Sequence, residues 1–323
     1  MLLAEVVRSG FAESRHRGAL VVLGPGGDLA LAAGDVTAPM FPRSASKPLQ
    51  AAGMLRAGLR LDGPLVALAA ASHAGEPFHI AGVRDILAGA GLAEDDLRCP
   101  PGLPLDDLVR YQYLRGGGQA DPIHMNCSGK HAAMLATCAT AGWSAASYLQ
   151  PGHPLQLRLR DTVERQSGET VTAMGMDGCG APLFALSLTG LARAYHSMIA
   201  AAPGSAERQV ADGMRAYPDW TAGTNRPESA LMRAVPGLLA KGGAEGVLAF
   251  ALADGWAATI KIEDGTARAL PALAVALLRQ LRPDACASAD AAELDRIGTV
   301  PVHGGGQVVG QVRPLLPATA PSQ

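Results

Sequence analysis

Strand-like segments lie at the two ends of this chain, and helix-like segments fill its middle. The predicted strands are at residues 19–22, 29–32, 246–253, 256–263 and 306–313. The predicted helices are at residues 48–59, 80–90, the run after Ser128, 154–169, 182–200, 205–216, 267–280 and 290–297. The apolar run at 64–71 fits a helix or a strand equally. This segregation is typical of an α+β fold, so we expect an antiparallel sheet built from both termini with a helical region inserted between them.

The composition favours one large folded unit. The chain has 323 residues, of which 48% are hydrophobic, and it shows no internal repeat or linker. We therefore expect a single domain over residues 1–323. The formal net charge is −2, the sequence pI is about 6.4, and aromatic residues make up only 4%. These values argue against nucleic acid or an anionic membrane as a partner.

The amino terminus and the cysteines predict a location. Residues 1–8 lack a basic start and are interrupted by Glu5, which argues against a secretory signal. No segment is both long and uncharged enough to span a bilayer. The five cysteines are an odd and sparse set, which is typical of a reducing compartment rather than of a disulfide framework. We therefore expect the protein to be cytoplasmic.

The segment at residues 126–131, Asn-Cys-Ser-Gly-Lys-His, places a thiol, an amine and an imidazole within five residues. An alanine-rich apolar run follows it. If that run is a helix, Cys127 lies one turn below both Lys130 and His131. The segment could be a metal site, an activated nucleophile, or an ordinary helix start.

A Ser-x-x-Lys pair, Ser44 and Lys47, stands at the predicted start of the helix at residues 48–59. At this spacing the amine can reach the hydroxyl within one turn. Burial lowers the pKa of a lysine, which lets it act as a base toward serine. Serine β-lactamases and penicillin-binding proteins use this chemistry. The alternative is a helix N-cap serine followed by a surface lysine.

Two weaker segments could complete a site. Residues 72–76, Ser-His-Ala-Gly-Glu, carry the groups that a hydrolase uses, or they form a polar loop capped by Ser72. Lys241 with Gly242 and Gly243 partly matches the Lys-[Ser/Thr]-Gly strand that faces the nucleophile in Ser-x-x-Lys enzymes. The alternative for Lys241 is an exposed lysine in a glycine turn.

A second cysteine, Cys179, lies between two glycines that would expose its thiol. Together with Cys127 it could bind zinc, with Lys130 or His131 as the third ligand and water as the fourth. A lysine ligand must be neutral although its ordinary pKa is roughly 10.4, so chemistry alone prefers His131. The alternative is that both cysteines are simply buried.

Taken together, these segments resemble one family, the rhizobial-type (class 3) L-asparaginases. The matching blocks follow one another nearly end to end, at residues 7–10, 13–16, 43–50, 72–76, 126–131, 176–182, 241–247 and 261–265. Two departures stand out. The chain is short around residues 201–205, and Pro227-Glu228 follow the block at 222–226, in a stretch that often carries another cysteine.

The resemblance implies a serine β-lactamase-like and glutaminase-like fold, a homodimer, and hydrolysis of L-asparagine to L-aspartate and ammonia. It also implies two Ser-Lys pairs, Ser44 with Lys47 and Ser72 with Lys241, in which either serine could be the nucleophile. A zinc ion is implied at Cys127, Lys130 and Cys179, which favours the lysine over His131. The residues expected near the substrate are Arg43, His73, Glu76, Asp177 and His131.

Three other functions fit parts of the pattern. One is a related amidase that acts on glutamine or another amide. Another is a Ser-x-x-Lys peptidase or penicillin-recognising enzyme, against which the absence of a secretory signal counts. The last is a non-enzymatic metal-binding protein or sensor of amino-acid supply, against which the two intact Ser-Lys pairs count.

Overall fold

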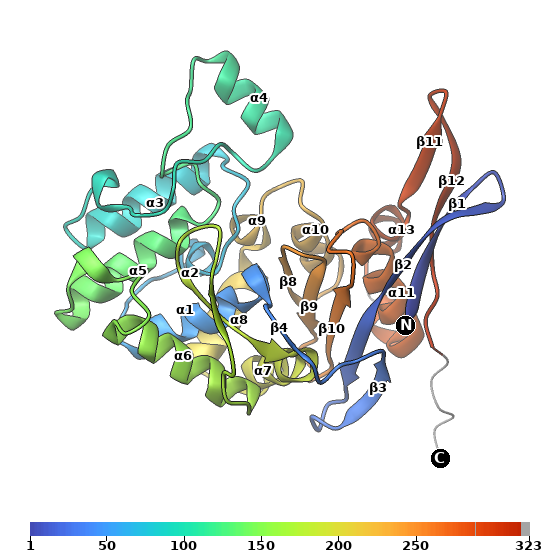
Figure 1. Cartoon of the computed structure of the whole chain (residues 1–323), viewed down its shortest axis with the longest axis horizontal. Helices are drawn as coiled ribbons and strands as arrows, with labels where there is room; N and C mark the ends of the chain where they lie inside the picture. The colour runs from blue at the N-terminus through green and yellow to red at the C-terminus, as the bar shows by residue number, and fades with distance from the viewer. Residues whose placement is uncertain (288, 318–323) are drawn as a thin grey trace.

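The computed structural model describes residues 1–287 and 289–317. In this part of the chain, the largest sheet has eight antiparallel strands in the order β11-β12-β1-β2-β10-β9-β8, with β3 paired to β2 (Figure 1). These strands are β1 (Leu2–Arg8), β2 (Phe11–Leu23), β3 (Leu29–Ala33), β8 (Leu239–Gly243), β9 (Val247–Ala251), β10 (Ala257–Ile262), β11 (Pro301–Gly304) and β12 (Gln307–Pro314). Both ends of the chain thus contribute strands to one sheet, as predicted.

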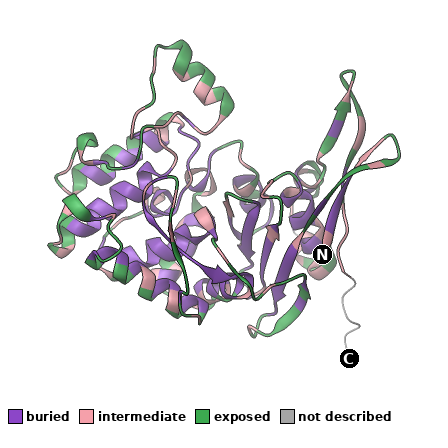
Figure 2. Cartoon of the chain, in the orientation of Figure 1, coloured by how far each residue is buried: buried purple, intermediate pink, exposed green. Residues whose placement is uncertain are grey.

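The helical region between these strands lies to one side of the sheet (Figure 1). Its main helices are α1 (Lys47–Arg56), α2 (Pro64–Ala69), α3 (Pro77–Gly89), α5 (Ser128–Ala141), α6 (Pro154–Ser167) and α8 (Ala206–Ala216). Helix α4 (Asp107–Arg115) projects from it and has no buried residue (Figure 2). The predicted α+β class, with an inserted helical region, is therefore confirmed.

Helices cover both faces of the sheet, as the alternation along β2 shows. Leu20 and Val22 pack into a cluster with α10 (Pro227–Ala234), α11 (Leu270–Leu281) and α13 (Ala291–Gly298). Val21 points to the opposite face and packs against α7 (Leu188–Ala200). Because both faces are covered, strands β9 and β8 carry buried residues in unbroken runs.

The helix predicted over residues 182–200 is wrong in its first part. Strands β6 (Pro182–Phe184) and β7 (Leu186–Ser187) occupy that part, and α7 begins at Leu188. The hydroxyl of Ser187 accepts a hydrogen bond from the Gly190 amide at 2.9 Å, which caps the helix there. The Glu169 carboxylate in turn accepts a bond from the Ser187 hydroxyl and fixes this start.

Besides the short elements given below, the strands β1, β8 and β11 and the helices α4 and α10 were not predicted. The glycines at the end of β8 favour a turn, but pairing with β9 holds them in the sheet as far as the Gly243–Val247 pair. The ambiguous run at residues 64–71 is the helix α2, with Pro64 in its first turn.

The remaining elements are short. They are β4 (Pro39–Met40), β5 (Met174–Met176), α9 (Pro218–Thr221), α12 (Pro283–Ala287) and the 3₁₀ helices η1 (Arg43–Ser46), η2 (Glu94–Asp96) and η3 (Ala145–Ser147). Strand β4 pairs with β7, and β5 pairs with β6. No helix within the described residues has the length and apolar character needed to cross a membrane.

Gly129 brings the first turn of α5 against α2. A Cβ atom at this position would lie 2.7 Å from the backbone oxygen of Leu68, closer than real Cβ contacts come. The glycine is therefore required for the approach of the two helices, and this approach places the flanking Cys127 and Lys130 in the protein interior.

We expect Gly129→Ala to destabilise the protein by about 1–3 kcal/mol, because backbone at α2 must move to admit the methyl group. Gly89→Ala is the matched control, since a Cβ at this last residue of α3 meets nothing within 4 Å. The control should be neutral or stabilising by up to about 1 kcal/mol. Urea unfolding of both variants measures the difference, and equal stabilities would contradict the close approach.

Candidate active site

One cavity of the described structure has a volume of about 400 Å³, in the range that holds small ligands. It lies between the sheet's edge strand, β8, and the helical region. The polar residues in its wall are Ser44, Ser72, Asn126, Arg226, Glu228 and Lys241. Both predicted serines and one predicted lysine thus face a single space.

Separate elements bring these residues together. Ser44 lies in η1, which leads directly into α1, and Lys241 lies in the middle of β8, opposite Ala249 of β9. Ser72 lies in the loop after α2. Its amide donates to the Thr221 carbonyl at 3.2 Å, which ties this loop to α9.

The amines of Lys47 and Lys241 converge on the hydroxyl of Ser72. Lys47 Nζ lies 2.9 Å from Ser72 Oγ, and Lys241 Nζ lies 3.1 Å from the same atom. Both lysines are only 1% exposed. Two buried amines on one serine are an unusual concentration of proton-carrying groups, as expected of a catalytic site.

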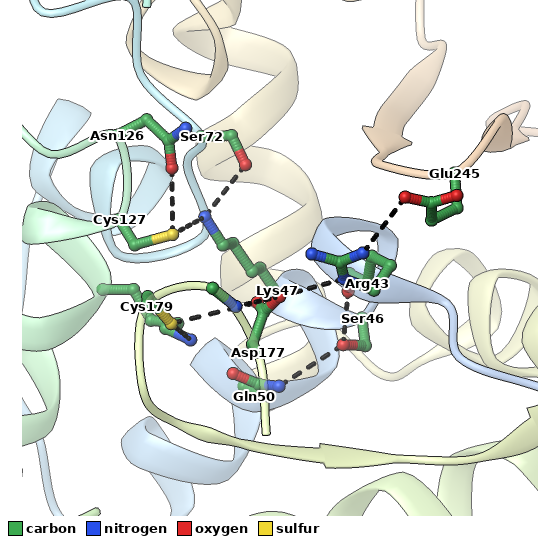
Figure 3. Close-up of polar contacts among 12 residues, drawn as sticks. Arg43, Ser46, Lys47, Gln50, Ser72, Asn126, Cys127, Asp177, Cys179 and Glu245 are labelled. Atoms are coloured by element: carbon green, nitrogen blue, oxygen red, sulfur yellow. Dashed lines mark hydrogen bonds and ion pairs between the residues drawn. The ribbon is translucent and has the colours of Figure 1, made fainter. Parts of the chain in front are cut away.

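The two lysines differ in their other contacts. The three donor positions of Lys47 are all used. Besides the shared serine, it donates to Cys127 Sγ at 3.0 Å (Figure 3), and it also donates to the Ala71 carbonyl at 2.7 Å. Lys241 has one further partner, the Gly242 carbonyl at 2.9 Å. Burial, together with the nearby charge of Lys47, lowers the pKa of Lys241 to about 7.

Only one of the two predicted Ser-Lys pairs is in contact in the structure. Ser72 contacts Lys241 as predicted, but Lys47 contacts Ser72 and not Ser44: in the described residues no hydrogen bond joins Ser44 to either lysine. Lys47 starts α1, so its side chain runs toward the loop after α2. Ser44 is half-buried in the cavity wall.

Cys127, Cys179 and Lys130 form a buried cluster next to this network. Lys130 Nζ lies 3.3 Å from Cys179 Sγ. A hydrogen bond from Cys127 lowers the pKa of Cys179, despite burial, and raises that of Cys127. Burial opposes charge on Lys130, but the charges of Cys179, Cys127 and Asp177 together outweigh it, so the pKa of Lys130 is raised. These shifts favour a thiolate at Cys179 beside an ammonium at Lys130.

His131 lies on the same turn but has a different partner. Its Nδ1 lies 2.6 Å from the hydroxyl of Tyr148, while its buried Nε2 has no hydrogen-bond partner in the described structure. Burial lowers the pKa of His131, which favours the neutral ring. Among the described residues, no three His, Cys, Asp or Glu side chains form a group that could hold a metal ion. The predicted zinc site thus stays a prediction.

Arg43 and Asp177 form an ion pair, with Nε and Oδ1 2.9 Å apart (Figure 3). Asp177 also lies near the cysteine cluster, since Cys179 Sγ is 3.8 Å from its Oδ2. This pair joins the start of α1 to the turn that carries Cys179.

His73 and Glu76, expected near the substrate, are not in the cavity wall. His73 is fully buried, and its Nε2 lies 2.8 Å from Ser128 Oγ. Glu76 accepts a hydrogen bond from the Thr224 amide at 2.9 Å. Their predicted contact with substrate stays a prediction, while the structure gives them contacts that support the loops around the cavity.

Three of the polar residues in the cavity wall were not predicted as site residues: Asn126, Arg226 and Glu228. Asn126 begins the cysteine segment at residues 126–131, but no role was predicted for it. Its Oδ1 lies 3.0 Å from Cys127 Sγ. Arg226 ends the recognisable block at residues 222–226, and Glu228 belongs to the stretch after it that departs from the family pattern. That block and that departure were the only sequence signals for them.

A family model described as L-asparaginase II matches residues 4–314 of the chain. The chain belongs to the L-asparaginase II family. This confirms the resemblance found in the sequence motifs. Membership indicates an amidohydrolase that acts on a small molecule, with the buried amines and serines as its candidate machinery. No curated protein matches the chain significantly.

Two solved structures illustrate what the chain is similar to. A crystal structure of Mglu is 16% identical with a TM-score of 0.46, and the alignment covers 86% of this chain and 64% of Mglu. A β-lactamase from Mycobacterium bovis is 14% identical with a TM-score of 0.43, and the alignment covers 81% of this chain and 93% of that one.

The lowered pKa of Lys241 makes stability depend on pH. Between about 7 and its ordinary value near 10.4, the unfolded chain binds one more proton at Lys241 than the folded protein does. The free energy of unfolding should therefore rise with pH over this window. Lys241→Met should reduce the slope by up to roughly 1.4 kcal/mol per pH unit.

Urea unfolding at about pH 7, 8 and 9, all within this window, measures how the free energy of unfolding changes with pH. Arg296→Met is the control. It also removes one positive charge, but the exposed guanidinium of Arg296 stays protonated at all three pH values, so its loss should not change the slope. If Lys241→Met and the wild type show the same slope, Lys241 has an ordinary pKa in the folded protein.

Proposed function

We propose that this protein hydrolyses L-asparagine to L-aspartate and ammonia through a serine nucleophile. The observation that carries the proposal is the convergence of Lys47 and Lys241 on Ser72, in a cavity that also exposes Ser44. Membership of the L-asparaginase II family supports the substrate.

The contacts suggest a different role for each serine. Ser72 Oγ lies within hydrogen-bond distance of both amines. It accepts from Lys47, and when Lys241 is neutral the Ser72 O–H can donate to that amine, so one lone pair is left to take the proton of Ser44. Such a hydroxyl is suited to passing protons rather than to attacking carbon. Ser44 lies in the cavity wall without an amine on its oxygen, so we assign it the attack.

In the first half-reaction, Ser44 Oγ forms a bond to the side-chain amide carbon of asparagine. Its proton moves through Ser72 to Lys241, whose pKa of about 7 makes it a base near neutral pH. The C–N bond then breaks, and ammonia leaves with a proton returned by the lysine. The product of this step is an aspartyl ester on Ser44.

In the second half-reaction, water replaces ammonia. Ser72 and Lys241 take a proton from the water as it attacks the ester carbon, and the C–O bond to Ser44 breaks. The proton returns to Ser44, and L-aspartate is released. Lys47 holds Ser72 in place, because its own position is fixed by hydrogen bonds to the Ala71 carbonyl and to Cys127 Sγ.

A zinc ion fits the neighbouring cluster, and we propose Cys127, Cys179 and Lys130 as its ligands. Two buried sulfurs and a nitrogen 3.3 Å from one of them are the donor types that zinc takes. Lys130 would lose its proton on binding. Bound zinc would supply a Lewis acid, while Lys47 donates to the Cys127 sulfur from outside the cluster. The homodimer and the cytoplasmic location stay predictions.

We expect the purified protein to release ammonia from L-asparagine, and Ser44→Ala to lower kcat at least about 1,000-fold, since removing a nucleophile removes the covalent route. Ser197→Ala is the control, because that hydroxyl only caps the Ala194 carbonyl within α7. Mass spectrometry of protein quenched during turnover should find an added aspartyl group on the peptide that contains Ser44.

Two results would contradict this assignment. An adduct on the Ser72 peptide would reverse the roles of the two serines. Ammonia released from L-glutamine but not from L-asparagine would make the protein a different amidohydrolase, although the family assignment would stand.

We expect the protein to bind zinc at one ion per chain, and Cys179→Ser to lose it. Cys286→Ser is the control, because Cys286 lies only half-buried against α11, away from the cluster. Zinc content by elemental analysis and the urea midpoint before and after chelation measure this. Lys130→Met should weaken zinc binding; if it does not and His131→Phe does, the imidazole is the third ligand.

A further inference from the structure

Two opposite charges stand in the cavity wall with no role in the steps above. Arg226 is the N-cap residue of α10, and Glu228 lies in the first turn of that helix. Both line the same cavity as Ser44, Ser72 and Lys241. The Glu228 side chain is only 13% exposed, so its charge is largely removed from solvent.

These two side chains are incompletely satisfied. Arg226 Nε and Glu228 Oε2 lie 4.0 Å apart, which is beyond hydrogen-bond distance. Each of these atoms is buried and has no hydrogen-bond partner in the part of the chain that the structure describes. A buried polar atom without a partner is costly, and a ligand that supplies the partner removes that cost.

Two glycines make the space for this pair. A Cβ at Gly242 would lie 2.1 Å from Glu228 Oε1, so the carboxylate rests directly on β8, next to Lys241. A Cβ at Gly223, where φ is +143°, would lie 3.2 Å from Arg226 Cγ and 3.1 Å from Glu76 Oε2. The loop is further held by the bond from the Thr224 amide to Glu76.

We propose that Arg226 and Glu228 bind the α-carboxylate and the α-ammonium group of the amino-acid substrate, respectively. The inference rests on the proposed function, and it adds how the substrate is recognised. An α-amino acid carries these opposite charges on one carbon, and the wall carries the complementary charges side by side. A guanidinium binds a carboxylate through two parallel N–H donors, and a carboxylate accepts from an ammonium.

The arrangement also sets the direction of the substrate. With its α-carbon held at the start of α10, the side-chain amide extends across the cavity, toward the wall that carries Ser44 and Ser72. Selection for an α-amino acid then comes from two charge-assisted contacts, while the reacting amide is handled by separate groups.

Substrates that lack one charge test each half of the proposal. 3-Aminopropanamide is asparagine without the α-carboxylate, and succinamate is asparagine without the α-amino group. Arg226→Gln should lower kcat/KM for L-asparagine about 10- to 100-fold and leave 3-aminopropanamide nearly unchanged. Glu228→Gln should lower kcat/KM for L-asparagine by a similar factor and leave kcat/KM for succinamate nearly unchanged.

The surface ion pair of Arg296 and Glu293 gives matched controls, Arg296→Gln and Glu293→Gln, which should keep wild-type kinetics on all three amides. Arg226→Lys keeps the charge and removes the two-pronged donor, so it should fall between Arg226→Gln and the wild type. It also serves if Arg226→Gln unfolds.

The outcomes separate the two proposals. If the wild type hydrolyses L-asparagine but Arg226→Gln loses the same factor on L-asparagine and 3-aminopropanamide, the recognition role is wrong. If the wild type releases no ammonia from L-asparagine, the proposed function fails, and calorimetry with L-aspartate then decides the subsite. If L-aspartate binds at least about 10-fold more weakly to Arg226→Gln than to Arg296→Gln, the recognition role of Arg226 is supported. Equal binding to the two variants, or no binding, overturns that role.

Discussion

The candidate active site depends on two buried lysine amines that meet at one serine hydroxyl. Lys47 is removed from water, and its amine donates to a carbonyl, a hydroxyl and a sulfur. Lys241 shares that hydroxyl, and burial together with the nearby charge of Lys47 lowers its pKa. Two chemically identical side chains are thus given different surroundings around one hydroxyl.

This arrangement links the sheet to the helical region. Lys241 comes from the edge strand β8, Lys47 from the start of α1, and Ser72 from the loop after α2. The sulfur of Cys127 continues the network into α5, where Gly129 lets the helix approach α2. A shift of any one of these elements would separate groups that exchange protons in the proposed mechanism. The candidate site therefore depends on the packing of four elements rather than on a single loop.

The sequence predicted what depends on local spacing. The segregation of strands and helices, the cysteine segment at the start of α5, and the serines and lysines of the site follow from short-range patterns and family motifs. The contact of Lys47 with Ser72 was not predictable, because it joins residues that only the packing of α1 against α2 brings together. The helix α10 was missed for a related reason, since its short apolar face has meaning only against β8 and α13.

Gly242 differs from the Ser or Thr that usually follows the lysine in strands of this type. The Glu228 carboxylate occupies the space that such a side chain would need. The two positions are therefore sterically coupled: a hydroxyl side chain at position 242 would have to displace the Glu228 carboxylate from β8. The bare backbone of Gly242 is thus what leaves room for a carboxylate beside Lys241.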